Sequence, residues 1–119
     1  HDPALAFVAM FGGRIGGSVR LTPITIGGRA AMVLGPLVVH PDFKDQGAGK
    51  ALIRHVLAAA KANGAGAVIL VGDRPYYGPL GFDPVPMNAI TLPGPVDPAR
   101  LLIAILDGTA WSGPARSIR

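Results

Sequence analysis

Residues 37–57 read LVVHPDFKDQGAGKALIRHVL, in which an apolar run, a glycine-rich loop and an amphipathic pattern follow one another. The apolar run extends over 30–39 and is uniform, which is typical of a central strand buried on both faces. From Gly49 onward, apolar residues recur with helical spacing and basic residues lie opposite them. This predicts an amphipathic helix of about four turns, with Asn63 and Gly64 as a C-terminal cap. The stretch therefore predicts a buried strand, a loop and a long helix.

The predicted central strand contains one irregular step, Gly35-Pro36. Proline has no N–H to donate to a ladder, so within sheets it is confined to edges, strand starts and bulges. We therefore expect the strand to bulge, or to part from its neighbour, at this step.

Shorter patterns on either side of this stretch predict the rest of the sheet. Apolar and β-branched runs, bounded by glycine pairs and prolines, indicate further strands at 4–11, 14–26, 67–71, 87–92 and 101–106. Asp73 followed by Pro75 is typical of the start of a short helix, which Gly78 and Pro79 would end. With no internal repeat or linker, we expect one mixed α/β domain over residues 1–119.

The composition narrows the classes of function. Of the 119 residues, 50% are hydrophobic and 15% are charged, which argues against a disordered chain. No segment approaches the roughly 20 uninterrupted apolar residues of a spanning helix, so we expect no membrane partner. The net charge of +4 comes from scattered lysines and arginines. Such scatter disfavours nucleic acid and suits a small anionic ligand.

The chemistry-bearing residue types are few. The chain has no cysteine, which excludes disulfides and thiolate nucleophiles and fits a cytoplasmic location. All 7 acidic residues are aspartates. Because His40 and His55 are scattered and no carboxylates are paired, we expect no metal site.

Gly47 and Gly49 are central to the chemistry of the loop. They let the backbone approach a ligand closely, and the helix that follows presents unpaired N–H groups at its positive end. Such a junction binds a phosphate or pyrophosphate. A Walker loop would need glycine where Lys44 stands and a hydroxyl where Ala51 stands, and a dinucleotide fingerprint would need glycine at Leu52.

Two motifs in register resemble the GNAT superfamily of acyltransferases. Val39-His40-Pro41 followed by QGAG at 46–49 is similar to its acetyl-coenzyme A loop, although Lys44 stands where the family usually has Arg or Gln, and Asp45 adds a carboxylate. Tyr76-Tyr77 followed by Gly81-Phe82 is similar to its second signature. The resemblance covers about 5–106. It implies an α/β (α+β) acyl-CoA N-acyltransferase fold: a mixed, mainly antiparallel sheet with a splayed central strand, one long helix and one short helix.

The resemblance also implies site residues. The pantetheine arm would pair with main-chain groups of Leu37, Val38 and Val39, and the Leu37 N–H would polarise the thioester carbonyl. Tyr77 would be the proton donor to the leaving thiolate, whereas Tyr76 would fill the core. The pyrophosphate loop would comprise Lys44, Asp45, Gln46, Gly47, Ala48, Gly49 and Lys50.

The general base is not identified by the sequence. Glutamate often serves in such enzymes and is absent here. Asp73 fits a helix cap better than a base, and structural or solvent-exposed roles fit His40 and His55. The resemblance implies transfer of an acetyl group from acetyl-CoA to a primary amine by direct attack. Two alternatives stay open: a non-catalytic acyl-CoA-binding or interaction module of the same fold, and an unrelated phosphate-ligand protein.

The two ends of the chain give further expectations. The resemblance places the start of the chain at the family's second strand, without the first strand and the helical pair. Either an N-terminal segment lies outside this sequence, or another subunit, such as a second copy in a homo-oligomer, covers the exposed sheet edge. At the other end, we expect Trp111 to be a packing anchor and 116–119 to be a solvated tail.

Overall fold

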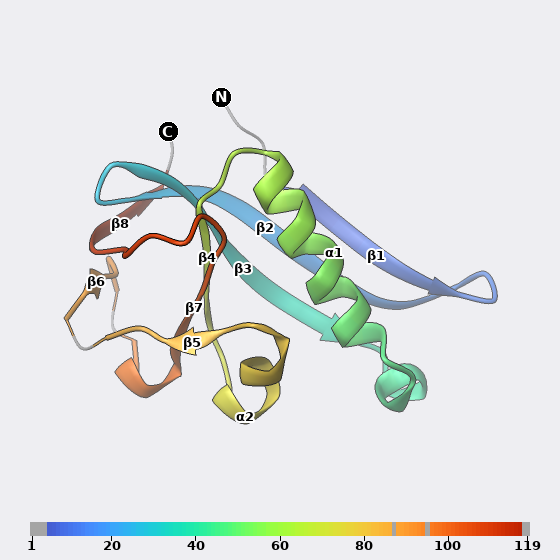
Figure 1. The fold of residues 1–119 in the computed structure, drawn as a ribbon. Helices are drawn as coiled ribbons and strands as arrows, with labels where there is room; N and C mark the ends of the chain where they lie inside the picture. Colours follow the sequence, from blue (N-terminus) through green and yellow to red (C-terminus); the bar gives the residue numbers. More distant parts are fainter. Residues whose placement is uncertain (1–4, 87, 95, 118–119) are drawn as a thin grey trace.

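The structure is a computed structural model and describes residues 5–86, 88–94 and 96–117. Strands dominate it, with one long helix, α1, and several short helical turns (Figure 1). In chain order the elements are β1 (Leu5–Phe11), β2 (Arg14–Ile26), β3 (Arg29–Val39), η1 (Pro41–Gln46), α1 (Ala48–Ala62), β4 (Ala67–Val71), α2 (Arg74–Tyr77), η2 (Gly78–Leu80), β5 (Asp83–Pro84), β6 (Ile90–Thr91), η3 (Pro98–Arg100), β7 (Leu101–Ile105) and β8 (Gly113–Ser117).

The described strands form one 8-stranded sheet in the order β5-β7-β4-β3-β2-β8-β6, with β1 pairing to β2 beside this path. The β3–β4 and β6–β8 pairs are parallel and the other pairs are antiparallel. Helix α1 crosses one face (Figure 1). The expected mixed, mainly antiparallel sheet with one long and one short helix is therefore confirmed.

The strand predictions are accurate where the local pattern is strong. Those at 14–26 and 67–71 are confirmed at both bounds, and those at 4–11, 30–39 and 101–106 agree within one residue. The strand predicted at 87–92 is too long: pairing is confined to Ile90–Thr91, and Met87 lies outside the described residues. The prolines and glycine around this pair limit its length.

Glycine pairs make both N-terminal hairpin turns. Gly12 and Gly13 have φ of 55° and 82°, and Gly27 and Gly28 have φ of 57° and 83°. Two central residues with positive φ define the type I′ turn, whose twist matches that of the paired strands. The turns therefore fix the β1–β2 and β2–β3 pairings.

Helix α1 packs its apolar side on the sheet. Its fully buried positions follow the predicted spacing: Leu52, Ile53, Val56 and Ala60. The Asn63 N–H donates to the Ala59 carbonyl at 3.0 Å, and Gly64 follows with φ of 86°, so the predicted cap is confirmed. Neither α1 nor any other described helix is long and apolar enough to cross a membrane.

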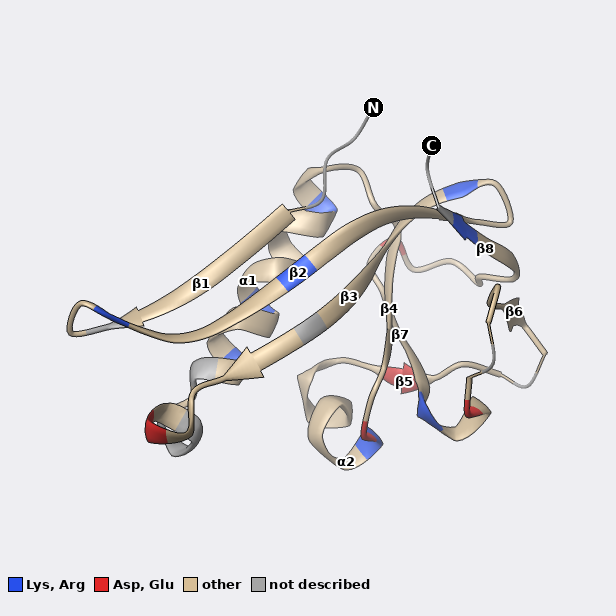
Figure 2. Cartoon of the chain, turned by 180° about the vertical axis from the view of Figure 1, so that it is seen from behind, with Lys and Arg blue, Asp and Glu red and all other residues tan. Residues whose placement is uncertain are grey.

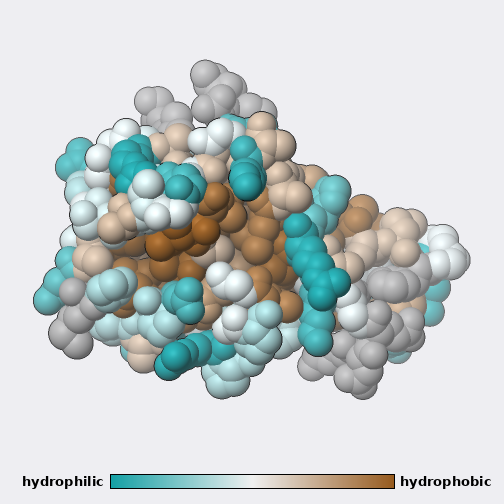
Figure 3. Space-filling model, viewed as in Figure 1, coloured by the Kyte–Doolittle hydropathy of each residue, from teal (hydrophilic) through white to brown (hydrophobic). Residues whose placement is uncertain are grey.

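Each face of the sheet carries its own core. The core under α1 includes Leu21, Ile53 and Phe82, and the core on the other face includes Ile26, Ile69 and Trp111. Figure 3 shows a band of apolar side chains in the middle of the α1 face. Half-buried apolar residues also pack against the first core: Leu57, Leu80 and Leu106. Alternation along the strands sends neighbouring residues to opposite cores.

The irregular step in β3 is a bulge. Leu21 pairs with Leu34 and Val19 pairs with Leu37, so Arg20 alone opposes Gly35 and Pro36. The extra residue reverses the alternation: Leu34 lies in the core under α1, as does Leu37 three residues later. The expectation that all of 30–39 is buried on both faces is wrong, because beyond the bulge Val38 is 54% exposed.

The C-terminal end adds a strand that sequence analysis missed. Trp111 is buried, as expected, but Arg116 is not part of a solvated tail: it lies in β8 and pairs with Thr25 of β2. Its side chain is exposed while its neighbour Ala115 is buried, because successive residues of a strand face opposite sides of the sheet. The last two positions, 118–119, lie outside the described residues.

Candidate active site

The bulge in β3 opens the sheet. Strands β3 and β4 pair only through Met32 with Val68 and Val33 with Ile69. Beyond these residues β3 stays with β2 and β4 stays with β7, so the two strands diverge (Figure 1). The expected splay is therefore present on the β4 side of β3.

Main-chain groups of β3 point into this opening. The His40 N–H donates to the Gly16 carbonyl of β2 at 2.7 Å. Because hydrogen bonding alternates along an antiparallel pair, Val38 also directs its amide to β2. Leu37 and Val39 then direct their N–H and C=O groups toward the opening. Of the three residues expected to contact a pantetheine arm, Leu37 and Val39 direct main-chain groups there and pair with no described strand on that side, whereas the Val38 amide faces β2.

The loop after β3 leads into the N-terminus of α1. Gly47 has φ of 79°, and its carbonyl accepts from the Ala51 N–H at 2.9 Å. The N-cap residue is Gly47, and no described side chain makes a cap hydrogen bond to α1, so N–H groups of the first turn keep their capacity to bind an anion. Lys50 is exposed at this end. The remaining predicted loop side chains lie outside what the structure describes: Lys44, Asp45, Gln46 and Ala48.

Tyr76 reaches this helix end. Gly49 is buried, and a Cβ built on it would overlap the Tyr76 hydroxyl and lie 3.6 Å from a Val39 methyl group. The expectation that Tyr76 fills the core is wrong: its side chain is 44% exposed. The short turn α2 directs consecutive residues to different sides, so Tyr77 turns to the core and Tyr76 spans toward α1. The sequence of the Tyr76-Tyr77 pair does not indicate which ring faces the core and which faces α1.

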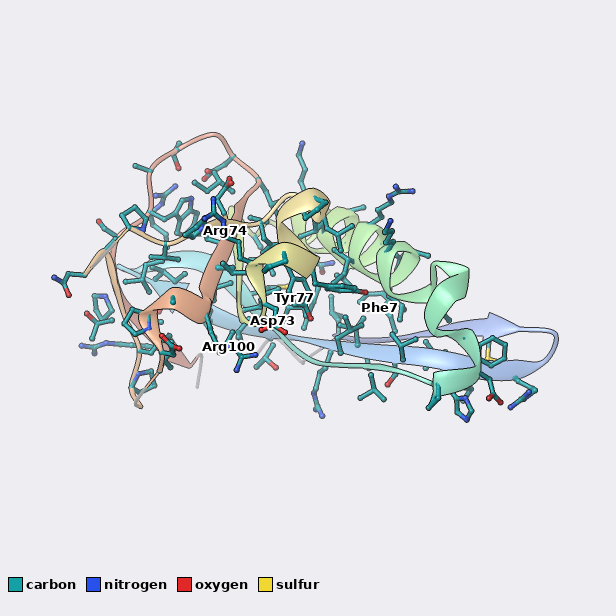
Figure 4. All side chains as sticks on the ribbon, turned by 90° about the horizontal axis from the view of Figure 1, so that it is seen from below. Phe7, Asp73, Arg74, Tyr77 and Arg100 are labelled. Atoms are coloured by element: carbon teal, nitrogen blue, oxygen red, sulfur yellow. The ribbon has the colours of Figure 1, made fainter. Side chains whose placement is uncertain are left out.

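Tyr77 is half-buried beside the opening (Figure 4). Its ring lies edge-on to Tyr76 at 4.9 Å and to Phe82 at 5.9 Å. Gly72 leaves room for the ring, because a Cβ there would lie 2.5 Å from it. Burial raises the pKa of the Tyr77 hydroxyl, and the nearby Tyr76 and Asp73 raise it further against a smaller lowering by Arg100. The hydroxyl is therefore a protonated donor at neutral pH.

Asp73 precedes α2 in the N-cap position, as expected, but its carboxylate makes no cap hydrogen bond. Its carbonyl accepts from the Tyr77 N–H at 3.0 Å. The carboxylate instead lies 3.5 Å from the Arg100 guanidinium. Sequence analysis missed Arg100. Arg100 directly precedes the strand predicted at 101–106. Its place near Asp73 could have been predicted only by pairing that strand antiparallel with the strand at 67–71.

The histidines have local roles. His40 Nδ1 accepts from the Asp42 N–H at 3.2 Å, and His55 lies edge-on to Phe7 at 4.8 Å. The described contacts bring neither ring to Tyr77. Within the described part of the chain, no three side chains of the metal-binding types gather.

Comparisons with known proteins agree with this geometry. The family model described as "Acetyltransferase (GNAT) family" matches residues 1–82. The uncharacterized N-acetyltransferase YjhQ of Escherichia coli (strain K12) is 31% identical over 86 residues, covering 69% of this chain and 48% of that protein. The chain thus spans about half the length of this curated relative.

Two solved structures share the fold. The GNAT family N-acetyltransferase YhbS from Escherichia coli, in complex with CoA, superposes with a TM-score of 0.83 at 21% identity, over 95% of this chain and 66% of that one. A GNAT family acetyltransferase from Brucella melitensis, in complex with acetyl-CoA, gives 0.73 at 27% identity, over 95% of this chain and 65% of that one. The family model over 1–82 and the 31% identical relative show that the chain belongs to the GNAT acetyltransferase family.

Proposed function

We propose that this chain transfers an acetyl group from acetyl-CoA to a primary amine. The observation that carries the proposal is the opening beside β3, into which Leu37 and Val39 direct main-chain groups that no described strand pairs. An extended pantetheine arm has amides that can pair there as a strand would. The opening leads to the N-terminus of α1, which suits a pyrophosphate. The acetyl-CoA bound to the Brucella melitensis relative supports the same coenzyme for this chain.

Two groups would assist the chemistry. The amine nitrogen attacks the thioester carbonyl carbon, a C–N bond forms, and the C–S bond then breaks. The Leu37 N–H donates to the carbonyl oxygen as it becomes an oxyanion. The amine loses one proton and the leaving thiolate gains one, so the products are an amide and free CoA thiol.

Tyr77 would act on the sulfur. A thiol on the cysteine analogy has a pKa near 8.5, below that of a tyrosine. Because burial raises the Tyr77 pKa further, full proton transfer from the hydroxyl to the thiolate is unfavourable. We therefore assign Tyr77 a hydrogen bond to the sulfur that strengthens as negative charge develops, while solvent relays the proton from the amine.

Calorimetric titration with acetyl-CoA tests the proposal. We expect binding by the wild type and its loss in Gly47→Trp, because an indole there blocks the approach to the first turn of α1. Gly64→Trp is the matched control: Gly64 ends the same helix, has a similar φ of 86°, and has open space around it, as Gly47 does. Equal affinity in both variants contradicts the proposed site. Binding without transfer to any amine would favour the non-catalytic module.

We also propose that a second copy covers the edge at β1. Among described strands, β1 pairs with β2 alone, and apolar side chains of β1 and of the adjacent β2 are about half exposed: Val8 at 55%, Met10 at 54% and Ile15 at 59%. Sedimentation should give a dimer, and Val8→Lys should shift it to a monomer. A monomeric wild type contradicts this assembly.

A further inference from the structure

The carboxylate of Asp73, beside Tyr77, makes no helix-cap hydrogen bond. Asp73 and Asp97 both occupy N-cap positions ahead of a proline. Asp97 accepts from the Ala99 N–H at 3.0 Å, which is the ordinary use of such a carboxylate. Asp73 makes no cap bond, and its side chain is 76% exposed. Its oxygens therefore retain most of their capacity to accept hydrogen bonds.

The described ion-pair partner of Asp73 is held loosely. The Arg100 guanidinium lies 3.5 Å from the carboxylate and is 50% exposed. Charge-assisted hydrogen bonds between such groups are normally about 2.7–2.9 Å, and an exposed pair of this kind contributes little to stability. A ligand can therefore displace the pair at small cost.

The backbone under this pair is fixed, in contrast to its side chains. Val71 pairs with Leu101 at the end of the β4–β7 ladder, and the Gly72 N–H donates to the Arg100 carbonyl at 2.9 Å. Asp73 and Arg100 are thus held at one place by neighbouring strands. Figure 2 shows an acidic residue just after β4 and a basic residue just before β7, both at the end of the sheet where α2 lies.

The pair also adjoins the proposed reaction centre. Figure 4 shows Asp73, Tyr77 and Arg100 gathered together. They lie at the end of β4 that has separated from β3, where the proposed coenzyme would present its thioester. An amine held by Asp73 would therefore lie within reach of the carbonyl.

We propose that Asp73 and Arg100 form the acceptor subsite, and that the acceptor is a primary amine that also carries an anionic group, a carboxylate or a phosphate. Asp73 accepts hydrogen bonds from the acceptor ammonium, which releases its proton to solvent before attack. Arg100 donates to the anionic group, for which its planar guanidinium is suited. The inference rests on the proposed acetyl transfer.

Matched amine pairs test it. Thiol release from acetyl-CoA by the 119-residue chain is measured with O-phosphoethanolamine against ethanolamine, and with β-alanine against propylamine. We expect kcat/KM to be about tenfold or more higher for an anionic member, as the loss of a charge-assisted hydrogen bond implies. The pair with the larger preference distinguishes a phosphate from a carboxylate acceptor.

Variants locate the preference. Arg100→Gln should bring the ratio within each pair close to one, and Arg100→Lys, which keeps the charge but not the planar fork, should leave an intermediate ratio. Arg116→Gln, an exposed arginine of β8, is the control and should leave the ratio unchanged. Asp73→Asn should raise KM for all four amines about tenfold, whereas Asp83→Asn should not.

The contradicting outcomes are separable from failure of the proposed function. A chain that binds acetyl-CoA in calorimetry, but shows equal kcat/KM within both pairs or transfers to none of the four amines, overturns the inference and leaves the coenzyme site standing. An unchanged ratio in Arg100→Gln also overturns it. A chain that does not bind acetyl-CoA overturns both.

Discussion

An aspartate and an arginine lie together beside each end of the β4–β7 ladder, and the two pairs differ. At one end Asp107 lies 2.8 Å from Arg29 and accepts from the Thr109 N–H at 3.0 Å, the Thr109 hydroxyl at 2.7 Å and Trp111 Nε1 at 3.2 Å. At the other end Asp73 has Arg100 at 3.5 Å.

The two ends of the ladder therefore suit different roles: the filled end stabilises the fold, and the looser end is available to a ligand. A carboxylate with its acceptor positions filled fixes the backbone around it and has little left for a ligand. Arg29 further covers the Trp111 ring at 3.7 Å, which binds the segment after β7 to the β2–β3 turn. The looser end adjoins Tyr77 and the opening beside β3, where a substrate needs unfilled groups. Substitutions at the two ends should therefore have different consequences.

The largest effect is expected at the filled end. Trp111→Ala removes a large side chain that is 6% exposed, and such truncations cost about 3–5 kcal/mol. Urea denaturation should show this loss of unfolding free energy, while acetyl-CoA affinity of the folded variant at low temperature stays unchanged. A loss below about 1 kcal/mol would show that Trp111 does not anchor this end.

At the looser end the expected effect is on turnover. Tyr77→Phe keeps the ring against Phe82 and removes the hydroxyl that would hydrogen-bond the sulfur, so kcat should fall roughly 10–100-fold with little change in the Kd for acetyl-CoA or in Tm. Steady-state kinetics and calorimetry give both quantities. Wild-type turnover in this variant would show that Tyr77 only packs against its neighbours. It would contradict a functional role for this end of the ladder.

Acid should weaken the filled end. Hydrogen bonds from the Thr109 side chain, and then from its backbone and from Trp111, together with Arg29, lower the Asp107 pKa to about 2 against a usual 3.8. A lowered folded-state pKa contributes stability that is complete above the unfolded value and is lost as pH falls through the folded value. Tm should therefore fall more steeply between about pH 4 and pH 2 in the wild type than in Asp107→Asn. Equal slopes in wild type and Asp107→Asn would contradict this account.

The smallest effect is expected where Tyr76 meets α1. Gly49→Ala should weaken acetyl-CoA binding severalfold, because the added methyl group overlaps the Tyr76 hydroxyl and displaces it. Gly64→Ala is the matched control: it should lower stability by about 1 kcal/mol, since φ is 86° there, and leave affinity unchanged. If Gly64→Ala weakened acetyl-CoA binding and Gly49→Ala did not, Tyr76 would have no role in the site.

Local patterns predicted the parts of the fold that depend on local chemistry. The bulge follows from Gly35-Pro36, the helix from its spacing, and the hairpins from their glycine pairs. What the sequence did not reveal depends on pairing between distant segments. Strand β8 exists because it meets Ile24–Ile26, and Arg29 finds Asp107 across 78 positions.

In the candidate site, too, local motifs predicted some residues, and others depend on pairing between distant segments. The loop glycines and Tyr77 were found from motifs, whereas Arg100 became visible only with the antiparallel register of β4 and β7. The orientation of Tyr76 depends on the geometry of one short turn, which composition does not encode. Asp73 was predicted to be a helix cap, and its position is confirmed, but its carboxylate makes no cap hydrogen bond and instead lies 3.5 Å from the Arg100 guanidinium.

Amide hydrogen exchange in β3, resolved by residue with NMR, tests the central claim most directly. Leu37 and Val39 direct their N–H groups to the opening, whereas Val38 directs its N–H to β2. Acetyl-CoA should therefore slow exchange at Leu37 and Val39 by tenfold or more, as roughly 1.4 kcal/mol of added protection implies, while Val38 is protected with or without it. Unchanged exchange at Leu37 and Val39 in the saturated complex would contradict the placement of the coenzyme between β3 and β4.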